Sequence, residues 1–390
     1  MTRLDHLASW HADWKDLRVA VLGLGVTGFS VADTLAELGC DVLVVAQKAD
    51  AEHLDILDVL GVRHKVGDDF QSLEVLEAFH PEVIVTSPGV PPTAPEIVWA
   101  AKNDIPVWVD IDLAWRVRDK TNRVADWIVI TGTNGKTTTT QLTTAMLSAA
   151  GHRAAACGNI GVPVLDCVRD PDGYDALVIE LSSFQLHYIG EVSPHSSALL
   201  NIDQDHLDWH GGFESYLAAK AKIYKNTQFA AVFNSADDNT EQALEDADVV
   251  EGCRAIGFTI GAPKLSEVGF VEDLLVDRAF IDDRANQALE IASLAEISQI
   301  GLVTPHLLAN VAAATALARS YGVEPEDIRD ALSNFKIDAH RIQLVADFED
   351  VKWVDDSKAT NPHATAASLS SFESVVWIVG GLLKGVDIKP

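Results

Sequence analysis

One stretch of the sequence combines glycines, a lysine and threonines at a spacing that suits a phosphate-binding turn. It reads Thr131-Gly132-Thr133-Asn134-Gly135-Lys136-Thr137-Thr138. The glycines allow a tight turn and let backbone N–H groups approach a ligand. The lysine can reach the β- and γ-phosphates of a nucleoside triphosphate, and a threonine hydroxyl can bind Mg²⁺. The sequence therefore predicts a nucleotide site formed by Gly132, Thr133, Asn134, Gly135, Lys136, Thr137 and Thr138.

The context of this stretch supports the prediction, although its spacing departs from the usual P-loop. The pattern G-x-x-x-x-G-K-[ST] would need glycine at position 130, which is Ile130. The apolar, β-branched run Ile128–Ile130 is typical of a buried strand. After Lys136, apolar residues recur at helical spacing. A helix that begins at a glycine-rich turn presents free N–H groups and the positive end of its dipole to an anion. An ordinary structural turn is the alternative.

Further polar residues follow two other predicted strands. Glu180 ends the apolar run Ala176–Glu180, and the acidic cluster Asp203–Asp208, which includes His206, follows the run Leu199–Ile202. Mg²⁺ prefers oxygen ligands, so Glu180 is predicted to bind Mg²⁺. His206 is predicted to bind a metal or a phosphate, with a solvated acidic loop as the alternative. Lys220 lies in a predicted helix. From its position alone, a solvated surface lysine is the default interpretation.

The N-terminal region predicts a β-α-β unit. The strand Arg18–Gly23 leads into the turn Gly23-Leu24-Gly25-Val26-Thr27-Gly28, a helix and a second strand, Asp41–Val45. NAD-binding proteins of this type carry an acidic residue at the end of the second strand. Here that position reads Ala46-Gln47-Lys48, so the phosphate of another nucleotide is favoured. Later, the strand Val83–Thr86 leads into a Pro-Gly turn that contains Gly89. This turn suits a ligand loop, with an ordinary structural turn as the alternative.

The ends of the chain give less specific signals. Arg3–Lys15 is interpreted as an amphipathic helix, and Thr304–Tyr321 as an alanine-rich helix that carries Asn310. Beyond a boundary near Phe335–Arg341, we predict a β-α-β unit that ends in the strand Val375–Val379. Two parallel strands cannot bury both faces of a sheet, so this third domain is expected to be cut short.

Composition limits the possible partners and compartment. A chain of 390 residues is long enough for two or three domains. Its net charge of −29 argues against nucleic acid or an anionic membrane as partner. No apolar run is long enough to span a membrane, and the N-terminus lacks an apolar signal region. The four cysteines show no disulfide or metal-binding spacing, which favours a reducing, cytoplasmic location.

Six motifs occur in the order in which the Mur ligases carry them, and the sequence resembles that family over essentially its whole length. They are Thr131-Gly132-Thr133-Asn134-Gly135-Lys136-Thr137, Gly158-Asn159-Ile160-Gly161, Glu180-Leu181-Ser182-Ser183-Phe184-Gln185-Leu186, Asp205-His206-Leu207-Asp208, His340-Arg341 and Asp356-Ser357-Lys358-Ala359-Thr360-Asn361. The resemblance implies a three-domain α/β fold. A Rossmann-like domain for the UDP-substrate would span 1–118, a P-loop-type ATPase domain 119–337, and an incomplete Rossmann-like domain for the amino acid 338–390.

The resemblance also implies an activity. It points to an ATP-dependent ligase that joins D-glutamate to UDP-N-acetylmuramoyl-L-alanine through an acyl phosphate, in cytoplasmic synthesis of the peptidoglycan precursor. A monomer without membrane insertion is expected. The alternatives are a Mur ligase that adds L-alanine or a diamino acid, a truncated nucleotide-binding form without turnover, and an NAD-dependent oxidoreductase.

The roles of individual residues follow position by position from the resemblance. Lys136, Glu180, His206 and Lys220 would be catalytic. One Mg²⁺ would be held by Thr137 and Glu180, and a second by His206 and Lys220, which resembles the family's carbamylated lysine. ATP would also be bound by Asn310, Arg341 and Asp356. The other substrates would be bound by Gly25, Val26, Thr27, Gly89, Asn159, Lys358, Thr360 and Lys384.

Overall fold

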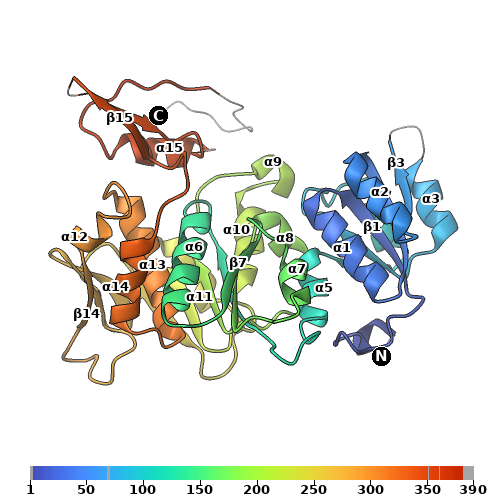
Figure 1. The fold of residues 1–390 in the computed structure, drawn as a ribbon, viewed down its shortest axis with the longest axis horizontal. Coiled ribbons are helices and arrows are strands. Elements are labelled where there is room, and N and C mark those ends of the chain that lie inside the picture. Colours follow the sequence, from blue (N-terminus) through green and yellow to red (C-terminus); the bar gives the residue numbers. More distant parts are fainter. Residues whose placement is uncertain (1–2, 68–70, 350, 360, 381–390) are drawn as a thin grey trace. The chain divides into compact units, whose positions relative to one another are not determined.

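The chain divides into two compact units, each with its own sheet (Figure 1). The computed structural model describes residues 3–67, 71–349, 351–359 and 361–380. The first unit comprises Met1–Asp126, Cys157–Leu177 and Leu181–Val192, and the second comprises Trp127–Ala156, Val178–Glu180 and Ser193–Pro390. The domain boundaries expected after residues 118 and 337 stay predictions.

The first unit is built on a five-stranded parallel sheet in the order β3-β2-β1-β4-β5. The central strand is fully buried over Val19–Leu22, because sheet strands covered on both faces need apolar side chains throughout. The strands are β1 (Arg18–Leu24), β2 (Asp41–Ala49), β3 (Arg63–Val66), β4 (Val83–Thr86) and β5 (Val107–Trp108). The helices are η1 (Arg3–His6), α1 (Val26–Glu37), α2 (Ala51–Val59), α3 (Ser72–Phe79), α4 (Pro95–Lys102), α5 (Asp110–Arg116), α7 (Val164–Arg169) and α8 (Ser183–Tyr188).

The glycine-rich turn of the first unit lies at the carboxyl end of β1, beside the end of β4. Gly23 has a φ of +92°, and a Cβ atom on Gly28 would lie 2.2 Å from the Gly23 carbonyl oxygen. Only glycine fits this close approach of helix and turn. The Ser87 N–H donates to the Leu22 carbonyl at 2.8 Å, which joins the loop after β4 to the same edge. The order of the sheet therefore brings the predicted loops around Gly25 and Gly89 together.

A nine-stranded sheet forms the core of the second unit, in the order β14-β13-β12-β11-β10-β9-β6-β8-β7. Strands β6, β9, β10, β11 and β12 pair in parallel with their neighbours in this order. Strand β13 pairs antiparallel with both β12 and β14. The first group of strands is β6 (Asp126–Thr131), β7 (Ala154–Gly158), β8 (Ala176–Glu180), β9 (Ser196–Leu199) and β10 (Ala230–Asn234). The second is β11 (Arg254–Phe258), β12 (Glu267–Val271), β13 (Leu274–Asp277) and β14 (Leu289–Ser293).

Helices α6, α13 and α14 pack together beside this sheet, as the green and orange ribbons of Figure 1 show. Helix α13 is buried along most of its length, because small alanine side chains allow close approach of its neighbours. The helices are α6 (Lys136–Ala149), α9 (Leu207–His210), α10 (Phe213–Ala221), η2 (Lys222–Tyr224), α11 (Asp238–Glu245), α12 (Leu294–Ile297), α13 (Pro305–Ser320) and α14 (Pro325–Asn334).

The C-terminal segment differs from the predicted β-α-β unit. It forms an antiparallel hairpin of β15 (Gln343–Phe348) and β16 (Val351–Asp355), followed by α15 (Pro362–Leu369). The predicted strand Val375–Val379 is wrong, since these residues have no regular structure and Val376 is 92% exposed. An apolar run becomes a strand only where a neighbouring strand accepts its backbone hydrogen bonds.

Two further expectations need correction. The predicted helix over Arg3–Lys15 is limited to the short 3₁₀ turn η1. Trp14 of this segment is nevertheless buried, at 1% exposed. The predicted strand Leu199–Ile202 ends at Leu199, and the next three residues form a loop.

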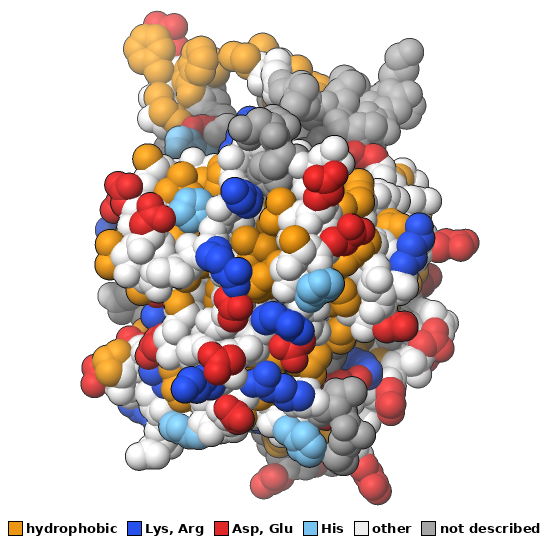
Figure 2. All heavy atoms as spheres, turned by 90° about the vertical axis from the view of Figure 1, so that its right-hand side faces the viewer, with side chains coloured by type: hydrophobic (Ala, Val, Ile, Leu, Met, Phe, Trp, Pro, Cys, Tyr) orange, Lys and Arg blue, Asp and Glu red, His pale blue; other side chains and the backbone are white. Residues whose placement is uncertain are grey.

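The surface and the helices bear on possible partners. Basic side chains lie across the middle of the face turned toward the viewer in Figure 2, with acidic side chains among and around them. The net charge of −29 therefore does not make this face uniformly acidic.

None of the helices in the described part of the chain is long and apolar enough to cross a membrane.

Candidate active site

The predicted phosphate loop connects β6 to the N-terminus of α6. Gly135 caps the helix with a φ of +84°, and a Cβ atom on it would lie 2.3 Å from the Asn310 Oδ1 atom. Both facts require glycine at this position. The Lys136 ammonium folds back and donates to the carbonyl oxygens of Gly132 and Thr133, each at 2.9 Å. The loop is thus a preformed turn with a cation at the start of a helix, which suits a phosphate.

Asn201, which sequence reasoning did not identify, holds this loop in shape. Its Oδ1 accepts from the Asn134 N–H at 2.8 Å, and its Nδ2 donates to the Asn134 carbonyl at 3.0 Å. The Thr133 N–H also donates to the Asn201 carbonyl at 3.0 Å. Asn201 follows β9, which pairs with β6. The sequence prediction placed Asn201 inside the strand Leu199–Ile202, and a polar amide within an otherwise apolar run was the signal that could have identified it.

Thr137 and Glu180, the two residues predicted to hold one Mg²⁺, are hydrogen-bonded to each other. Thr137 Oγ1 donates to Glu180 Oε2 at 2.9 Å, and Glu180, at the end of β8, is only 2% exposed. A hydroxyl and a carboxylate oxygen at the start of α6 are the donors that Mg²⁺ prefers, so this pair fits the ion. Among the described residues, no group of three or more His, Cys, Asp or Glu side chains is arranged to hold a metal.

Lys220 is buried in α10 rather than solvated. Its Nζ donates to the Gly132 carbonyl at 2.8 Å and to Thr131 Oγ1 at 3.2 Å, and the residue is 2% exposed. Burial lowers the pKa of this amine well below its usual value, and the charge of Lys136 adds to the effect. The structure therefore places Lys220 beneath the phosphate loop as an amine that loses its proton readily.

His206 lies at the start of α9, in the loop that follows β9. The structure gives it a φ of +51°, and its Nε2 lies 3.6 Å from Asp205 Oδ2. The same loop is joined to the phosphate loop, because the Asp203 N–H donates to Thr133 Oγ1 at 2.9 Å. An unmodified lysine amine is a poor ligand for Mg²⁺. A second metal on His206 and Lys220 therefore fits this chain only with an oxygen-bearing group on the lysine.

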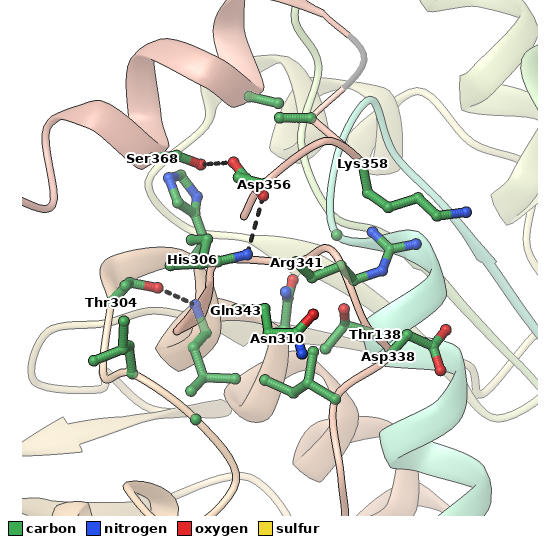
Figure 3. Close-up of a pocket in the computed structure, with 18 of the residues that line it drawn as sticks. Thr138, Thr304, His306, Asn310, Asp338, Arg341, Gln343, Asp356, Lys358 and Ser368 are labelled. Atoms are coloured by element: carbon green, nitrogen blue, oxygen red, sulfur yellow. Dashed lines mark hydrogen bonds between the residues drawn. The ribbon is translucent and has the colours of Figure 1, made fainter. Parts of the chain in front are cut away.

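A cavity of about 700 Å³ opens beside the phosphate loop (Figure 3). Asn134, Gly135, Thr138 and Asn310 line one part of it. Arg341, Asp356 and Lys358 of the C-terminal segment line another, and in Figure 3 the side chains of Arg341 and Lys358 extend toward the same side. The Arg341 Nε atom is buried and has no hydrogen-bond partner among the described residues. Arg341 as a whole is half-buried, and its unpartnered Nε–H calls for an acceptor oxygen such as that of an anion.

Asp356 is fixed within its segment. Its Oδ1 accepts from the Ile342 N–H at 3.1 Å, and its Oδ2 accepts from Ser368 Oγ at 2.5 Å (Figure 3). The Lys358 N–H also donates to the His340 carbonyl, at 3.1 Å. These bonds connect the hairpin, the loop after it and α15, which we call the C-terminal frame. The frame fixes the carboxylate of Asp356 and the backbone of Lys358.

The remaining predicted residues fall in two groups. The first unit contains Gly25, Val26 and Thr27 at the start of α1, Gly89 after β4, and Asn159 in the turn after β7. The second group, Thr360 and Lys384, lies outside the described residues.

Comparison with known proteins gives a consistent assignment. Residues 17–109 match the profile of the Mur ligase MurD-like N-terminal domain, and residues 130–318 match that of the Mur ligase middle domain. A UDP-N-acetylmuramoylalanine–D-glutamate ligase of Leifsonia xyli subsp. xyli is 58% identical over 99% of this chain and 77% of that protein. The protein of that name from Tropheryma whipplei strain Twist is 47% identical over 100% of this chain and 81% of its own.

The chain belongs to the Mur ligase family. This confirms the family expected from the six motifs. Solved Mur ligase structures share its fold. The murein peptide ligase of Psychrobacter arcticus has a TM-score of 0.53 at 19% identity, covering 91% of this chain and 75% of that one. The UDP-N-acetylmuramate–alanine ligase of Thermotoga maritima has a TM-score of 0.51 at 19% identity, covering 91% and 77%. The expected three-domain α/β class of the Mur ligases is confirmed by these neighbours.

Proposed function

We propose that this Mur ligase joins D-glutamate to UDP-N-acetylmuramoyl-L-alanine at the expense of ATP. Its relatives at 58% and 47% identity carry the name of that activity. The observation that carries the proposal is the cavity in which the phosphate loop faces Arg341 and Lys358. A preformed turn and several cations around one cavity suit the transfer of a phosphoryl group between anions.

The proposed binding of ATP uses residues that already meet in the second unit. The N–H groups of the loop Gly132–Thr138 and the Lys136 ammonium would hold the phosphates. Asn310, Arg341 and Asp356 would bind the rest of the nucleotide, because all three line the same cavity as the loop. Lys136 would leave its two carbonyl partners and turn toward the phosphates, which are stronger acceptors.

The proposed reaction has two steps. The L-alanine carboxylate of the acceptor attacks the γ-phosphorus of ATP, and the bond to the bridging oxygen breaks, which gives an acyl phosphate and ADP. The amine of D-glutamate then attacks the acyl carbon and loses a proton, and inorganic phosphate leaves. Both attacked groups are surrounded by negative charge, so the cations Lys136, Arg341 and Lys358 would lower the barrier by electrostatic stabilisation.

The metal sites are part of the proposal. Thr137 and Glu180 would hold one Mg²⁺, and His206 with a carbamylated Lys220 would hold a second. Bound Mg²⁺ would neutralise the charge of the phosphates. Carbamylation requires a neutral amine that adds to CO₂ with release of a proton, and the low pKa of the buried Lys220 favours that form.

The UDP part of the acceptor is proposed to bind the first unit. Gly25, Val26 and Thr27 form the N-terminus of α1, and Gly89 lies in the loop that the sheet order places beside it. A helix N-terminus at the carboxyl edge of a parallel sheet is suited to a diphosphate. Asn159 is proposed to contact the muramoyl part. Thr360, Lys358 and Lys384 are proposed to position phosphate and D-glutamate.

The proposed cellular setting follows from the reaction. The enzyme would act as a cytoplasmic monomer in peptidoglycan precursor synthesis, where its nucleotide-linked substrates and ATP are found. Neither nucleic acid nor a membrane is proposed as a partner, because a net charge of −29 repels both.

The test is ADP release that depends on both the acceptor and D-glutamate. We expect Lys136→Ala to lower kcat/KM by at least about 100-fold, since it removes a cation from the transferring phosphoryl group. Lys264→Ala, at an exposed lysine, is the matched control and should leave the rate unchanged. ATP affinity and turnover that survive Lys136→Ala would contradict the proposed site. Turnover with L-alanine or a diamino acid in place of D-glutamate would contradict the proposed substrate.

A further inference from the structure

Three asparagines form a continuous chain of hydrogen bonds across the second unit. Asn201, after β9, is bonded to the backbone of Asn134 in the phosphate loop at both its N–H and its carbonyl. The side chain of Asn134 is left for another partner. Its Oδ1 accepts from the Nδ2 of Asn361 at 2.9 Å. The chain therefore runs from the sheet through the phosphate loop to the C-terminal segment.

Asn361 uses both ends of its amide. Its Oδ1 accepts from the Ala364 N–H at 2.8 Å and so caps the N-terminus of α15. Its Nδ2 reaches the phosphate loop, and the residue is only 7% exposed. Both the oxygen and the nitrogen of this buried amide are hydrogen-bonded. Asn361 therefore fixes the start of α15 relative to Asn134.

The helix that Asn361 caps belongs to the frame that carries the charged residues of the cavity. Ser368, on α15, donates to Asp356, and Asp356 in turn accepts from the N–H of Ile342, next to Arg341. The bond between Asn134 and Asn361 thus connects the loop proposed for the triphosphate with the frame proposed for the rest of the nucleotide.

We propose that Asn361 is a positioning residue that couples the phosphate loop to the frame bearing Asp356 and Lys358. It touches neither reacting group in this scheme and acts through Asn134. A nucleotide that orders the loop would thereby also fix the frame, and a displaced frame would weaken binding at the loop. This inference rests on the proposed function in one respect only, because one of its two tests measures the binding of ATP.

Two substitutions separate the bond from the other roles of these residues. Asn361→Ser keeps a side-chain oxygen that can cap α15 but removes the amide donor. Asn134→Ala removes the acceptor and leaves the backbone groups that Asn201 holds. Asn334→Ser is the matched control, because the exposed Asn334 on α14 donates its Nδ2 only to the Asp330 carbonyl of its own helix among the bonds that the structure shows.

Calorimetric binding of ATP, without acceptor, gives the first measurement. One neutral hydrogen bond corresponds to a loss of about three- to ten-fold in affinity, which we expect for each single variant. The double variant should be no weaker than either single one, because both remove the same bond. Asn334→Ser should bind as the unmodified chain does. Losses that multiply in the double variant, or no loss in either single one, would overturn the proposal.

Amide hydrogen exchange of the free protein gives the second measurement. We expect α15 and residues 355–359 to exchange faster in Asn361→Ser and Asn134→Ala, and at the original rate in Asn334→Ser. Unchanged exchange in the first two variants would overturn the coupling. If the unmodified chain fails to bind ATP, the proposed function is wrong, and the exchange rates still decide whether the bond holds the frame.

Discussion

At the scale of single residues, glycines 135 and 151 share one backbone conformation but differ in their surroundings. Their φ values are +84° and +85°, in the left-handed region that favours glycine. A Cβ atom on Gly135 would collide with the Asn310 side chain, whereas nothing lies within 4 Å of one on Gly151. Gly135 is therefore required by its conformation and by its neighbour, and Gly151 by its conformation alone.

Alanine at these two positions should separate strain from function. Both Gly135→Ala and Gly151→Ala should lower the free energy of unfolding by about 1 to 2 kcal/mol through left-handed strain. Only Gly135→Ala should weaken ATP binding, because it displaces Asn310 and the start of α6. Thermal unfolding and calorimetric titration of both variants measure the two effects. Equal ATP affinity of the two variants would contradict the role of Gly135.

A second residue-scale feature is the buried carboxyl of Asp110 in the first unit. Its two oxygens each accept from Gln185 Nε2 at 3.2 Å, and the residue is 3% exposed. Burial raises the pKa of this carboxyl to about 6, although the bond from Gln185 opposes the change. Neither residue has a role predicted from the sequence.

Asp110 should make stability depend on pH in the weakly acidic range. The folded chain binds a proton below about pH 6, whereas the unfolded carboxyl does so only near 3.8, so the folded state holds more protons between these values. The contribution to the free energy of unfolding is therefore present below pH 4 and is lost as pH rises to 6. Asp110→Asn keeps an oxygen for Gln185 but has no carboxyl to titrate. The free energy of unfolding of the variant minus that of the original chain should therefore be up to roughly 3 kcal/mol larger at pH 7 than at pH 4. Urea unfolding at several pH values measures this difference, and parallel curves would refute it.

At the scale of elements, a buried ion pair joins helix α13 to strand β13. Arg319 Nε lies 3.0 Å from Asp277 Oδ2, with side chains 7% and 0% exposed. Asp277 also accepts from the N–H groups of Ala279 and Phe280, which turns the chain after β13. Asn310 lies in the second turn of α13, and Arg319 lies near its C-terminus. The pair therefore helps to fix the helix that borders the phosphate loop.

Removal of one partner should be costly. Arg319→Met leaves the Asp277 carboxylate buried without its cation, and we expect a loss of about 3 to 5 kcal/mol in the free energy of unfolding. The exposed pair of Arg123 and Asp175 offers the control, and Arg123→Met should cost no more than about 1 kcal/mol. Chemical unfolding of both variants measures the contrast. A similarly small loss of unfolding free energy in both variants would contradict this prediction, because it would mean that other groups stabilise the buried Asp277 carboxylate.

At the scale of the whole molecule, charge should govern the encounter with substrates. The chain carries −29, and ATP and a UDP-linked acceptor are also anions. The cations around the cavity act at short range, whereas the repulsion extends over the Debye length. The proposed substrates would therefore have to bind against the net negative field of the chain.

Added salt should relieve this repulsion. Raising KCl from about 10 mM to about 150 mM shortens the Debye length from roughly 30 Å to roughly 8 Å. We expect kcat/KM for the acceptor to rise over this range, because screening removes the long-range barrier to encounter. Initial rates at subsaturating acceptor measure it, with sucrose of matched osmolarity as the control. A steady fall would show that local cations dominate the approach.

Much of the site could be read from local patterns. The loop Thr131–Thr138, the strand that ends at Glu180 and the glycine turn near Gly25 each combine a strand with a polar or glycine-rich end, and strand ends in parallel sheets meet at one edge. The strand Val375–Val379 and the helix Arg3–Lys15 were wrong for the opposite reason. Their apolar residues specified burial without specifying a partner, and among the described residues neither run pairs with a strand or extends into a longer helix.

The sequence by itself determined the family and the glycine-rich turn between β6 and α6, because both depend on short motifs at the ends of strands. Only the tertiary structure decided that Lys220 lies buried beneath the loop, that Asn201 clamps it and that Asn361 reaches Asn134. These contacts join residues 67 to 227 positions apart. Burial and partners at such separations are set by the packing of whole elements, which no local pattern encodes.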